Sequence, residues 1–284
     1  MTQGVILFAR NNPQVDYVKQ AHFLAKRIRK YLDLPTTIVT DSEEYLINAY
    51  PDYTDVFDNV ISIPWKLGTS MKRYHDGAIT QKKLDFRNDA RCMAYDLSPY
   101  TETLLLDTDY VVSDSIFKNC FTQNGNFLIY KDAYDLANFR DYSEFKYISD
   151  TSVDFYWATC VFFRKTEVNK IFFDLVAHIQ DNWQHYNSIF QINSSVFRND
   201  HAFSIAIHIM NGYQSGPFAN IMPGKLFYTT DKDLLVKLKD EQFLFLTEKE
   251  KHLGEYVPIK FANSSVHVMN KFSLNRVIDE AQND

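Results

Sequence analysis

Short apolar runs alternate with polar turns in the N-terminal part of the chain. Gly4 to Ala9 and Thr36 to Thr40 are runs of β-favouring residues too short for helices, so we predict two buried strands. Between them, apolar residues recur at nearly helical spacing from Asp16 to Leu32, which predicts an amphipathic helix. A strand, a helix and a second strand in this order indicate a βαβ unit. An α/β fold with a mainly parallel sheet and a ligand crevice at its carboxyl edge is therefore expected.

Thr103 to Val112, T-L-L-L-D-T-D-Y-V-V, is the most informative stretch. Its leucines predict a buried strand, and burying an unpaired carboxylate costs roughly several kcal/mol, so Asp107 and Asp109 are expected at the strand's carboxyl end. Alternate residues of a strand point to the same face, which lets both carboxylates converge on one ligand. Paired oxygen donors suit Mg²⁺ or Mn²⁺. A solvated turn is the other interpretation of this D-x-D.

The remaining pattern continues the alternation of strands and helices. Strands are predicted over Val56 to Pro64, Asn126 to Tyr130 and Asp154 to Arg164. Helices are predicted over Asp89 to Leu97, Thr166 to Tyr186 and Ala202 to Met210. The last of these helices is apolar on all sides and is therefore expected to be buried. Trp65 to Asp85 is polar and contains Gly68, Gly77 and the cation pairs Lys72-Arg73 and Lys82-Lys83. It predicts a loop that either closes over a diphosphate or is a surface excursion. Lys232 to Lys251 is lysine-rich and is interpreted as a surface helix and loop.

Composition narrows the class of protein. The chain has 284 residues, of which 45% are hydrophobic and 23% charged, as in soluble globular proteins. A net charge of −6 argues against broad coating of nucleic acid or anionic membrane. The three cysteines form no C-x-x-C, so neither a disulfide framework nor a zinc site is indicated, and a cytoplasmic location is the default expectation. The N-terminal apolar run is interpreted as a strand and not a signal peptide, and no transmembrane segment is expected.

Two common nucleotide-binding motifs are missing from the sequence. No G-x-G-x-x-G follows the first strand and no G-x-x-x-x-G-K-[ST] occurs, which argues against dinucleotide enzymes and P-loop NTPases. Asp41 ends the second strand and either accepts hydrogen bonds from a base or ribose or caps a helix from Ser42 onward. His267 lies in an extended segment ahead of Lys271, either as one polar residue of a terminal strand or as a ligand-binding group.

Five motifs together resemble a known family. They are T-T-I-V-T-D at the second strand, S-P-Y-T-E-T-L-L-L-D-T-D-Y-V-V, W-A-T-C-V-F-F, N-D-H and V-H-V-M-N-K. In this order they resemble the GT-A fold nucleotide-sugar glycosyltransferases, most closely the glycogenin and bacterial galactosyltransferase-like branch. The resemblance is firmest from Arg91 to Ser113. It implies one GT-A domain over 1–284, with a Rossmann-like mainly parallel sheet, a nucleotide-sugar-binding half (1–115), an acceptor-binding half (116–230) and a C-terminal segment (231–284) that returns His267 and Lys271 to the site.

The resemblance also implies roles for individual residues. Asp107, Asp109 and His267 would bind Mn²⁺ or Mg²⁺. Arg91 and Lys271 would neutralise the diphosphate, and with Asp200 they are the expected catalytic residues. The other implied positions are Ala9, Arg10, Asn11, Asp41 and Thr108 for a uridine-type nucleotide, with Trp157, Ala158, Thr159 and Asp200 near the donor and acceptor sugars. The chain departs from the family's pattern at His201, at Thr159-Cys160 and at Asn270.

The function implied is metal-dependent transfer of a hexose from a UDP-sugar, with retention of configuration. The acceptor is left open between glycan, lipid, protein and modified nucleic acid. One alternative is a haloacid-dehalogenase-like phosphotransferase with Asp107 as nucleophile, because D-T-D-Y-V also fits that motif. Its second acidic pair would have to come from Asp231 and Asp233. The other alternative is a non-catalytic module that binds nucleotide sugar or glycan.

Overall fold

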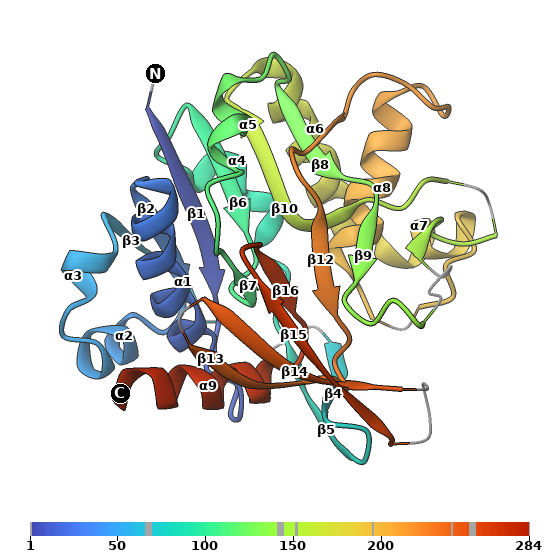
Figure 1. Cartoon of the computed structure of the whole chain (residues 1–284). Helices are drawn as coiled ribbons and strands as arrows, with labels where there is room; N and C mark the ends of the chain where they lie inside the picture. The colour runs from blue at the N-terminus through green and yellow to red at the C-terminus, as the bar shows by residue number, and fades with distance from the viewer. Residues whose placement is uncertain are drawn as a thin grey trace.

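A large mixed sheet runs through the middle of the molecule (Figure 1). The computed structural model describes residues 2–65, 70–140, 145–150, 153–194, 196–239, 241–249 and 254–283. In this described part the large sheet has seven strands, in the spatial order β11 (Asn220–Ile221), β8 (Phe127–Tyr130), β10 (Trp157–Arg164), β6 (Glu102–Leu106), β1 (Gln3–Ala9), β2 (Thr36–Thr40) and β3 (Asn59–Ser62).

Most neighbouring strands of this sheet run parallel. β1 pairs in parallel with β2 and β6, β2 pairs in parallel with β3, and β11 pairs in parallel with β8. β10 is antiparallel to both of its neighbours, β6 and β8. Every residue of β2 and β6 is buried, as expected for strands covered on both faces. The predicted α/β class and mainly parallel sheet are confirmed.

Helices pack against this sheet. α1 (Tyr17–Leu32) lies on β1 and β2, and α8 (Asn199–Met210) lies on β10. The side chain of Asp16 caps α1 by accepting from the amide of Lys19. The other helices are α2 (Glu43–Ala49), α3 (Tyr53–Val56), α4 (Ala94–Leu97), α5 (Lys118–Thr122), α6 (Glu167–Asp181), α7 (Trp183–Ile189), α9 (Lys271–Asn283) and a 3₁₀ turn over Arg91–Met93. None of the helices in the described part is long and apolar enough to cross a membrane.

A second sheet brings the C-terminal segment beside the D-x-D turn. Its order is β7 (Tyr110–Val111), β16 (Val266–Val268), β12 (Leu226–Thr229) and β9 (Ala133–Asp135). β16 is antiparallel to β7, with His267 opposite Tyr110. Because Tyr110 directly follows Asp109, this pairing fixes His267 next to the acidic turn.

The predicted surface helix and loop over Lys232 to Lys251 is wrong. Its described residues form β13 (Leu234–Lys239) and β14 (Gln242–Glu248), which pair with β15 (Tyr256–Ala262) in an antiparallel sheet, while residues 240, 250 and 251 lie outside the described residues. Phe243 and Phe245 are buried at alternate positions in a second core that includes Ile278 of α9. Burial in β14 therefore alternates with a period of two, and the lysines of this segment that lie in a strand, Lys237 and Lys239, are exposed on β13.

Three other expected elements differ in extent. The predicted loop from Trp65 to Asp85 is wrong for most of its length, since β4 (Ser70–Asp76) and β5 (Thr80–Phe86) form a hairpin; residues 66–69 lie outside the described residues. Gly77 at its turn has a φ of +79°, which favours glycine. The helix expected over Asp89 to Leu97 is reduced to the 3₁₀ turn and α4, and that over Thr166 to Tyr186 is divided into α6 and α7.

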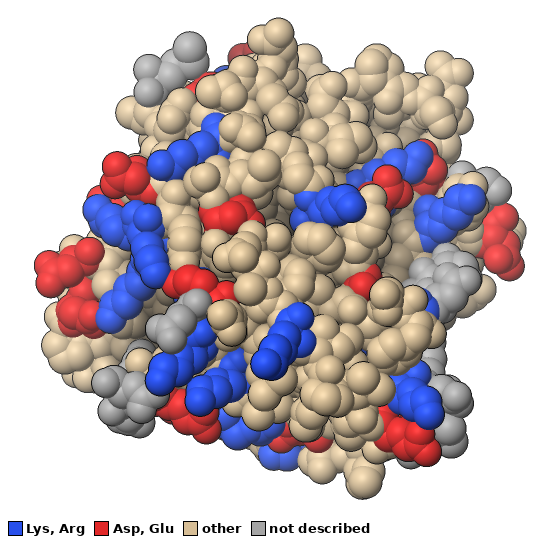
Figure 2. Space-filling model, viewed as in Figure 1, with Lys and Arg blue, Asp and Glu red and all other residues tan. Residues whose placement is uncertain are grey.

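Charge is distributed without one dominant patch on the face shown in Figure 2. Lys and Arg side chains are interspersed with Asp and Glu there.

Candidate active site

The D-x-D turn lies at the carboxyl end of β6, as the sequence predicts. Leu106 ends the strand, and the amide of Asp107 donates to the carbonyl of Thr159 on β10 at 2.9 Å. On the other side of the turn, the amide of Val268 donates to the carbonyl of Asp109 at 2.9 Å. The backbone of the turn is therefore held between a strand of the large sheet and β16.

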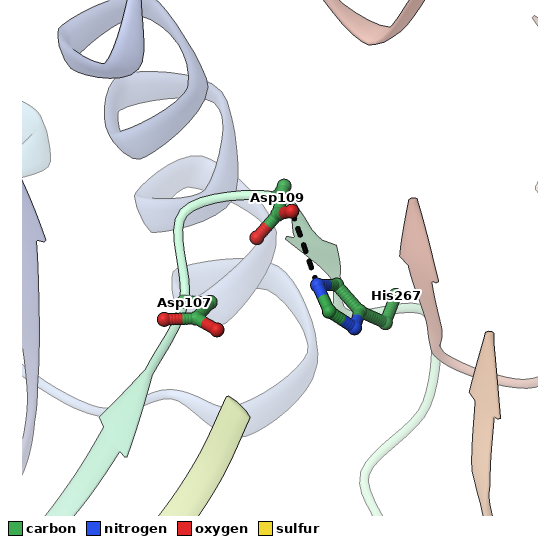
Figure 3. A group of neighbouring side chains, drawn as sticks. All are labelled: Asp107, Asp109 and His267. Atoms are coloured by element: carbon green, nitrogen blue, oxygen red, sulfur yellow. Dashed lines mark hydrogen bonds and ion pairs between the residues drawn. The ribbon is translucent and has the colours of Figure 1, made fainter. Parts of the chain in front are cut away.

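Asp107, Asp109 and His267 converge at this turn. Both aspartates extend from the loop after β6, and the imidazole of His267 points toward Asp109 (Figure 3). Nε2 of His267 lies 3.0 Å from Oδ2 of Asp109, and Nδ1 lies 3.5 Å from the hydroxyl of Thr159. One ligand atom from each of the three residues lies within 4.8 Å of the other two. Two carboxylates and an imidazole at this separation form a donor set for a divalent cation.

Lys271, at the start of α9, adds a positive charge to this group. Its Nζ lies 2.5 Å from the same Oδ2 of Asp109 that His267 contacts. Burial alone would raise the pKa of Asp109, but the charges and hydrogen bonds of Lys271 and His267 outweigh burial and hold that pKa below its usual range. Burial likewise acts to lower the pKa of Lys271, but Asp109 outweighs it and raises that pKa. Asp109 is therefore a carboxylate and Lys271 an ammonium ion at neutral pH.

Arg91 approaches the turn from the opposite direction. Its guanidinium forms an ion pair with Asp107 and also donates to the backbone carbonyls of Ala158 and Thr159. The side chain of Arg91 is 5% exposed, whereas that of Asp107 is 37% exposed. Arg91 is thus fixed between β10 and the turn, and Asp107 remains accessible.

These side chains line a cavity of about 470 Å³. Its wall includes Phe86 to Asn88, Ala90, Arg91 and Arg198 to Asp200, and Phe145, Trp157 and Tyr228 contribute aromatic rings. Its volume is within the range of small-molecule sites, which combine apolar walls with a few convergent polar groups.

Asp200 faces the same cavity from the first turn of α8. Its Oδ1 accepts from the amide of Ala158 at 2.9 Å, and its Oδ2 pairs with Arg198 at 2.9 Å. Burial opposes ionisation of Asp200, but Arg198 and His201 outweigh it and lower its pKa. The structure therefore brings Asp200, Trp157, Ala158 and Thr159 into one cavity with the D-x-D turn.

The residues expected to hold the nucleotide divide into two groups. Arg10 and Thr108 line the cavity, and the hydroxyl of Thr108 donates to Gln20 at 3.3 Å. Ala9 is buried in the core. The side chain of Asn11 bonds to the amide of Val18 and to Asp16 at the start of α1, outside the cavity lining.

Asp41 is enclosed by arginines. Its side chain has 0% exposure and pairs with Nε of Arg10 at 3.1 Å and Nη1 of Arg87 at 3.5 Å. Arg10 also pairs with Asp89, and Arg87 lies over the ring of Trp65 at 5.0 Å. In this arrangement Asp41 holds two guanidinium groups at the cavity wall.

Sequence reasoning missed several residues of the cavity wall. Arg87, Asn88, Arg198 and Asn199 line the cavity, as does Lys72 of β4, which was noted only as one of the cations of the expected loop. The side-chain oxygens of Asn88 and Asn199 are buried without a hydrogen-bond partner among the described residues. No local motif marks these positions, because they are brought together only by the fold.

Comparison with known proteins identifies structural neighbours alone. No known family model matches the chain, and no curated protein matches it in sequence. The galactosyltransferase LgtC, solved with donor and acceptor sugar analogues, superimposes with a TM-score of 0.46 and 12% identity over 71% of this chain and 70% of its own. The apo form of the glycosyltransferase GlyE from Streptococcus pneumoniae TIGR4 gives a TM-score of 0.40 and 12% identity over 73% of this chain. That match spans 44% of the GlyE chain, so this chain corresponds to less than half of it.

Proposed function

We propose that this chain is a metal-dependent glycosyltransferase of the GT-A type. It would move a hexose-type sugar from a nucleoside diphosphate sugar, UDP-sugar foremost, to an acceptor, with retention as in the branch it resembles. The observation that carries this proposal is the convergence of Asp107, Asp109 and His267 with two cations, Arg91 and Lys271, in one cavity at the carboxyl end of β6. A group with three metal-ligand side chains beside two cations suits a diphosphate with its metal ion.

The residues present fit a divalent cation. Oδ2 of Asp109 already accepts from the ammonium group of Lys271 and lies 3.0 Å from Nε2 of His267, and Asp107 presents an accessible carboxylate nearby. Carboxylate oxygens with one imidazole are compatible with Mn²⁺ and Mg²⁺. Asp107, Asp109 and His267 would hold the ion, which when bound supplies a Lewis acid that neutralises charge on the leaving diphosphate.

The chain's own cations and carboxylates account for the remaining steps. As the glycosidic bond breaks, negative charge grows on the nucleoside diphosphate, and Lys271 and Arg91 stabilise it by charge-assisted hydrogen bonds. Asp200 is fixed by Ala158 and Arg198, so its ionised carboxylate can accept hydrogen bonds from sugar hydroxyls. The aromatic wall makes part of the cavity apolar, and Phe145, its half-buried member, is the ring on which a sugar would stack, because Trp157 and Tyr228 are buried.

Binding of a nucleoside diphosphate provides the first test. UDP, GDP, CDP and ADP are added with Mn²⁺, Mg²⁺ or chelator while the melting temperature is followed. A ligand at 100 times its Kd stabilises by about 2.7 kcal/mol, which a melting curve resolves. We expect at least one diphosphate to stabilise the protein only with metal, and Asp109→Asn to remove this effect.

A matched variant and an activity measurement complete the test. Asp96→Asn, on the exposed surface of α4, should retain the full stabilisation. Once a donor is found, Asp109→Asn should lower its turnover by about 10²-fold or more, because charge-stabilising groups contribute effects of that order. Turnover of Asp109→Asn equal to that of the unmodified enzyme would falsify the proposal.

The phosphotransferase alternative is disfavoured by the position of its second acidic pair. Asp233 is 1% exposed and pairs with Arg140 at 2.8 Å, which leaves only Asp231 of that pair in the cavity lining. The same melting experiment separates the two functions. Stabilisation by a beryllium fluoride adduct, with no response to any nucleoside diphosphate, would favour the phosphotransferase.

A further inference from the structure

Lys72 is the exception among the cations that line the cavity. Each of the other lining cations of the described part lies no more than 3.8 Å from a carboxylate oxygen. These are Arg10, Arg87, Arg91, Arg198, Lys232 and Lys271. Lys72 forms no ion pair with any described residue. Its Nζ lies instead over the rings of Phe86, at 4.9 Å, and Tyr74, at 5.6 Å.

The hairpin that carries Lys72 is tied to the rest of the molecule. The hydroxyl of Tyr74 lies 3.1 Å from that of Tyr17 on α1, and Asp76 pairs with Arg276 of α9 through two contacts of 2.8 Å. At the turn, the amide of Ala78 donates to the hydroxyl of Tyr256 at 2.6 Å. In Figure 1 the β4–β5 hairpin lies beside the antiparallel sheet of β13 to β15. These ties place the ammonium group of Lys72 at the cavity wall.

The surroundings of Lys72 are unfavourable for a cation without a bound anion. Burial, followed by the nearby charges of Lys271 and Arg198, lowers the pKa of Lys72 to about 8. Asp231 and Asp109 act in the opposite sense without contacting Lys72. A cation held near two others, with no acidic partner, is stabilised when an anion enters the cavity.

We propose that Lys72 binds the diphosphate of the donor, and of the nucleoside diphosphate that leaves, together with Lys271. This inference rests on the proposed function and extends the diphosphate-binding group to the β4–β5 hairpin. Lys72 is a binding residue here, and no proton or covalent bond is transferred through it. Its cation would hold phosphate oxygens from the hairpin side of the cavity.

Titration calorimetry of matched variants tests this role. Lys72→Met removes the charge but keeps a flexible apolar stem against Tyr74 and Phe86. We expect its Kd for the best nucleoside diphosphate, and for pyrophosphate with Mg²⁺, to rise about tenfold, as for loss of a charge-assisted hydrogen bond. Binding of the corresponding nucleoside, which has no phosphate, should not change. Lys72→Arg should restore most of the affinity.

Two comparisons exclude a trivial loss of folding. Arg73→Gln, at the neighbouring exposed position of β4, should bind the diphosphate like the unmodified protein. Without ligand, Lys72→Met should melt at the same temperature as the unmodified protein or higher, because repulsion from Lys271 and Arg198 is relieved. If Lys72 only stabilised the fold, Lys72→Met would melt at a lower temperature. Weaker diphosphate binding without a lower melting temperature therefore indicates a binding role.

The contrary outcomes are separable from failure of the proposed function. If Lys72→Met binds the diphosphate within about twofold of the unmodified protein while Asp109→Asn has lost binding, the role of Lys72 is wrong and the glycosyltransferase proposal stands. An equal loss of diphosphate affinity in Arg73→Gln would also overturn the role of Lys72, because removing any positive charge from the hairpin would then weaken binding. If the unmodified protein binds neither pyrophosphate nor any nucleoside diphosphate, both proposals are wrong.

Discussion

Asp107 and Asp109 belong to one short motif but have different surroundings. Asp109 has a side chain that is 6% exposed and is held by His267 and Lys271, whereas the side chain of Asp107 is 37% exposed and pairs with Arg91. Asp109 is therefore the fixed, ionised member of the pair, and Asp107 is the member that a ligand in the cavity reaches most easily. The difference arises because β16 and α9 cover one side of the turn.

His201 links burial to pH-dependent stability. It lies between Phe155 and Trp183, and burial, with Arg198, lowers its pKa from 6.5 to about 4. The unfolded chain binds this proton more tightly, so stability is fully present above pH 6.5 and falls as the pH drops toward 4. The loss between pH 7 and pH 4.5 should be about 2 kcal/mol, measured by urea unfolding.

Replacing His201 by Gln should remove most of that slope. His22 and His208, whose pKa values burial also lowers, leave a remaining slope in the variant. His178→Gln, on α6, is the matched control and should keep the full dependence. A slope in His201→Gln equal to that of the unmodified protein would show that His201 is not buried as a neutral imidazole.

Elements with a continuous apolar run were predicted well. Such a run is present in β1, β2, β6 and β10. A strand that is buried on both faces is apolar throughout, so it can be recognised without knowing which strands it pairs with. β4, β5 and β13 were missed because few of their residues are buried and lysines lie among the rest, and β14 was missed because it was grouped with the lysine-rich residues on either side of it. Their pairing depends on long-range contacts with α9 and β15, which a local pattern does not contain.

Arg140 joins several of these elements. Its guanidinium pairs with Asp135 of β9 at 2.6 Å and with Asp233, ahead of β13, at 2.8 Å, and it donates to the carbonyl of Glu248 at 3.1 Å. The two carboxylates are 8% and 0% exposed. Arg140→Met leaves both without this cation, so we expect a loss of about 3–5 kcal/mol in the free energy of unfolding.

Urea unfolding of a second variant separates the ion pairs from packing. Asp135→Asn with Arg140→Met should recover part of the loss, because one unpaired buried charge is removed. Lys170→Met, whose partner Asp174 lies on the exposed surface of α6, should leave stability nearly unchanged, because solvent screens an exposed pair. A loss for Arg140→Met as small as that for Lys170→Met would mean that the buried cluster does not stabilise the fold.

At the scale of the whole molecule, the candidate site joins segments that are distant in the chain. Asp107 and Asp109 were recognisable because they are adjacent in sequence and follow an apolar strand. His267 and Lys271 required the resemblance, since nothing local distinguishes V-H-V from an ordinary strand. Lys72 was recognisable only as one of several cations in an expected loop, and Arg198 was not recognisable, because only the tertiary fold brings them to the cavity. Metal coordination, nucleotide binding and the three-part division of 1–284 stay predictions.

Ligand binding should therefore stabilise both distant segments together. The amide of Val268 donates to the carbonyl of Asp109, and His267 pairs with Tyr110 across β16 and β7. Any opening that separates β16 from the turn would disrupt the group of Asp107, Asp109 and His267. A bound diphosphate and metal would oppose that opening. With the ligand at 100 times its Kd, amide exchange that depends on this opening should slow by about 100-fold in the segments 102–112 and 264–272.

Hydrogen exchange followed by mass spectrometry checks this coupling. α6 does not line the cavity, so its peptide 167–181 should exchange at an unchanged rate and serves as the internal control. In His267→Ala, protection of both segments should fall together, because the ligand is held less tightly and β16 no longer contributes to the site. Protection of 102–112 alone in the unmodified protein would mean that the ligand contacts only the D-x-D half, and His267 would then have to be removed from the proposed metal-binding group.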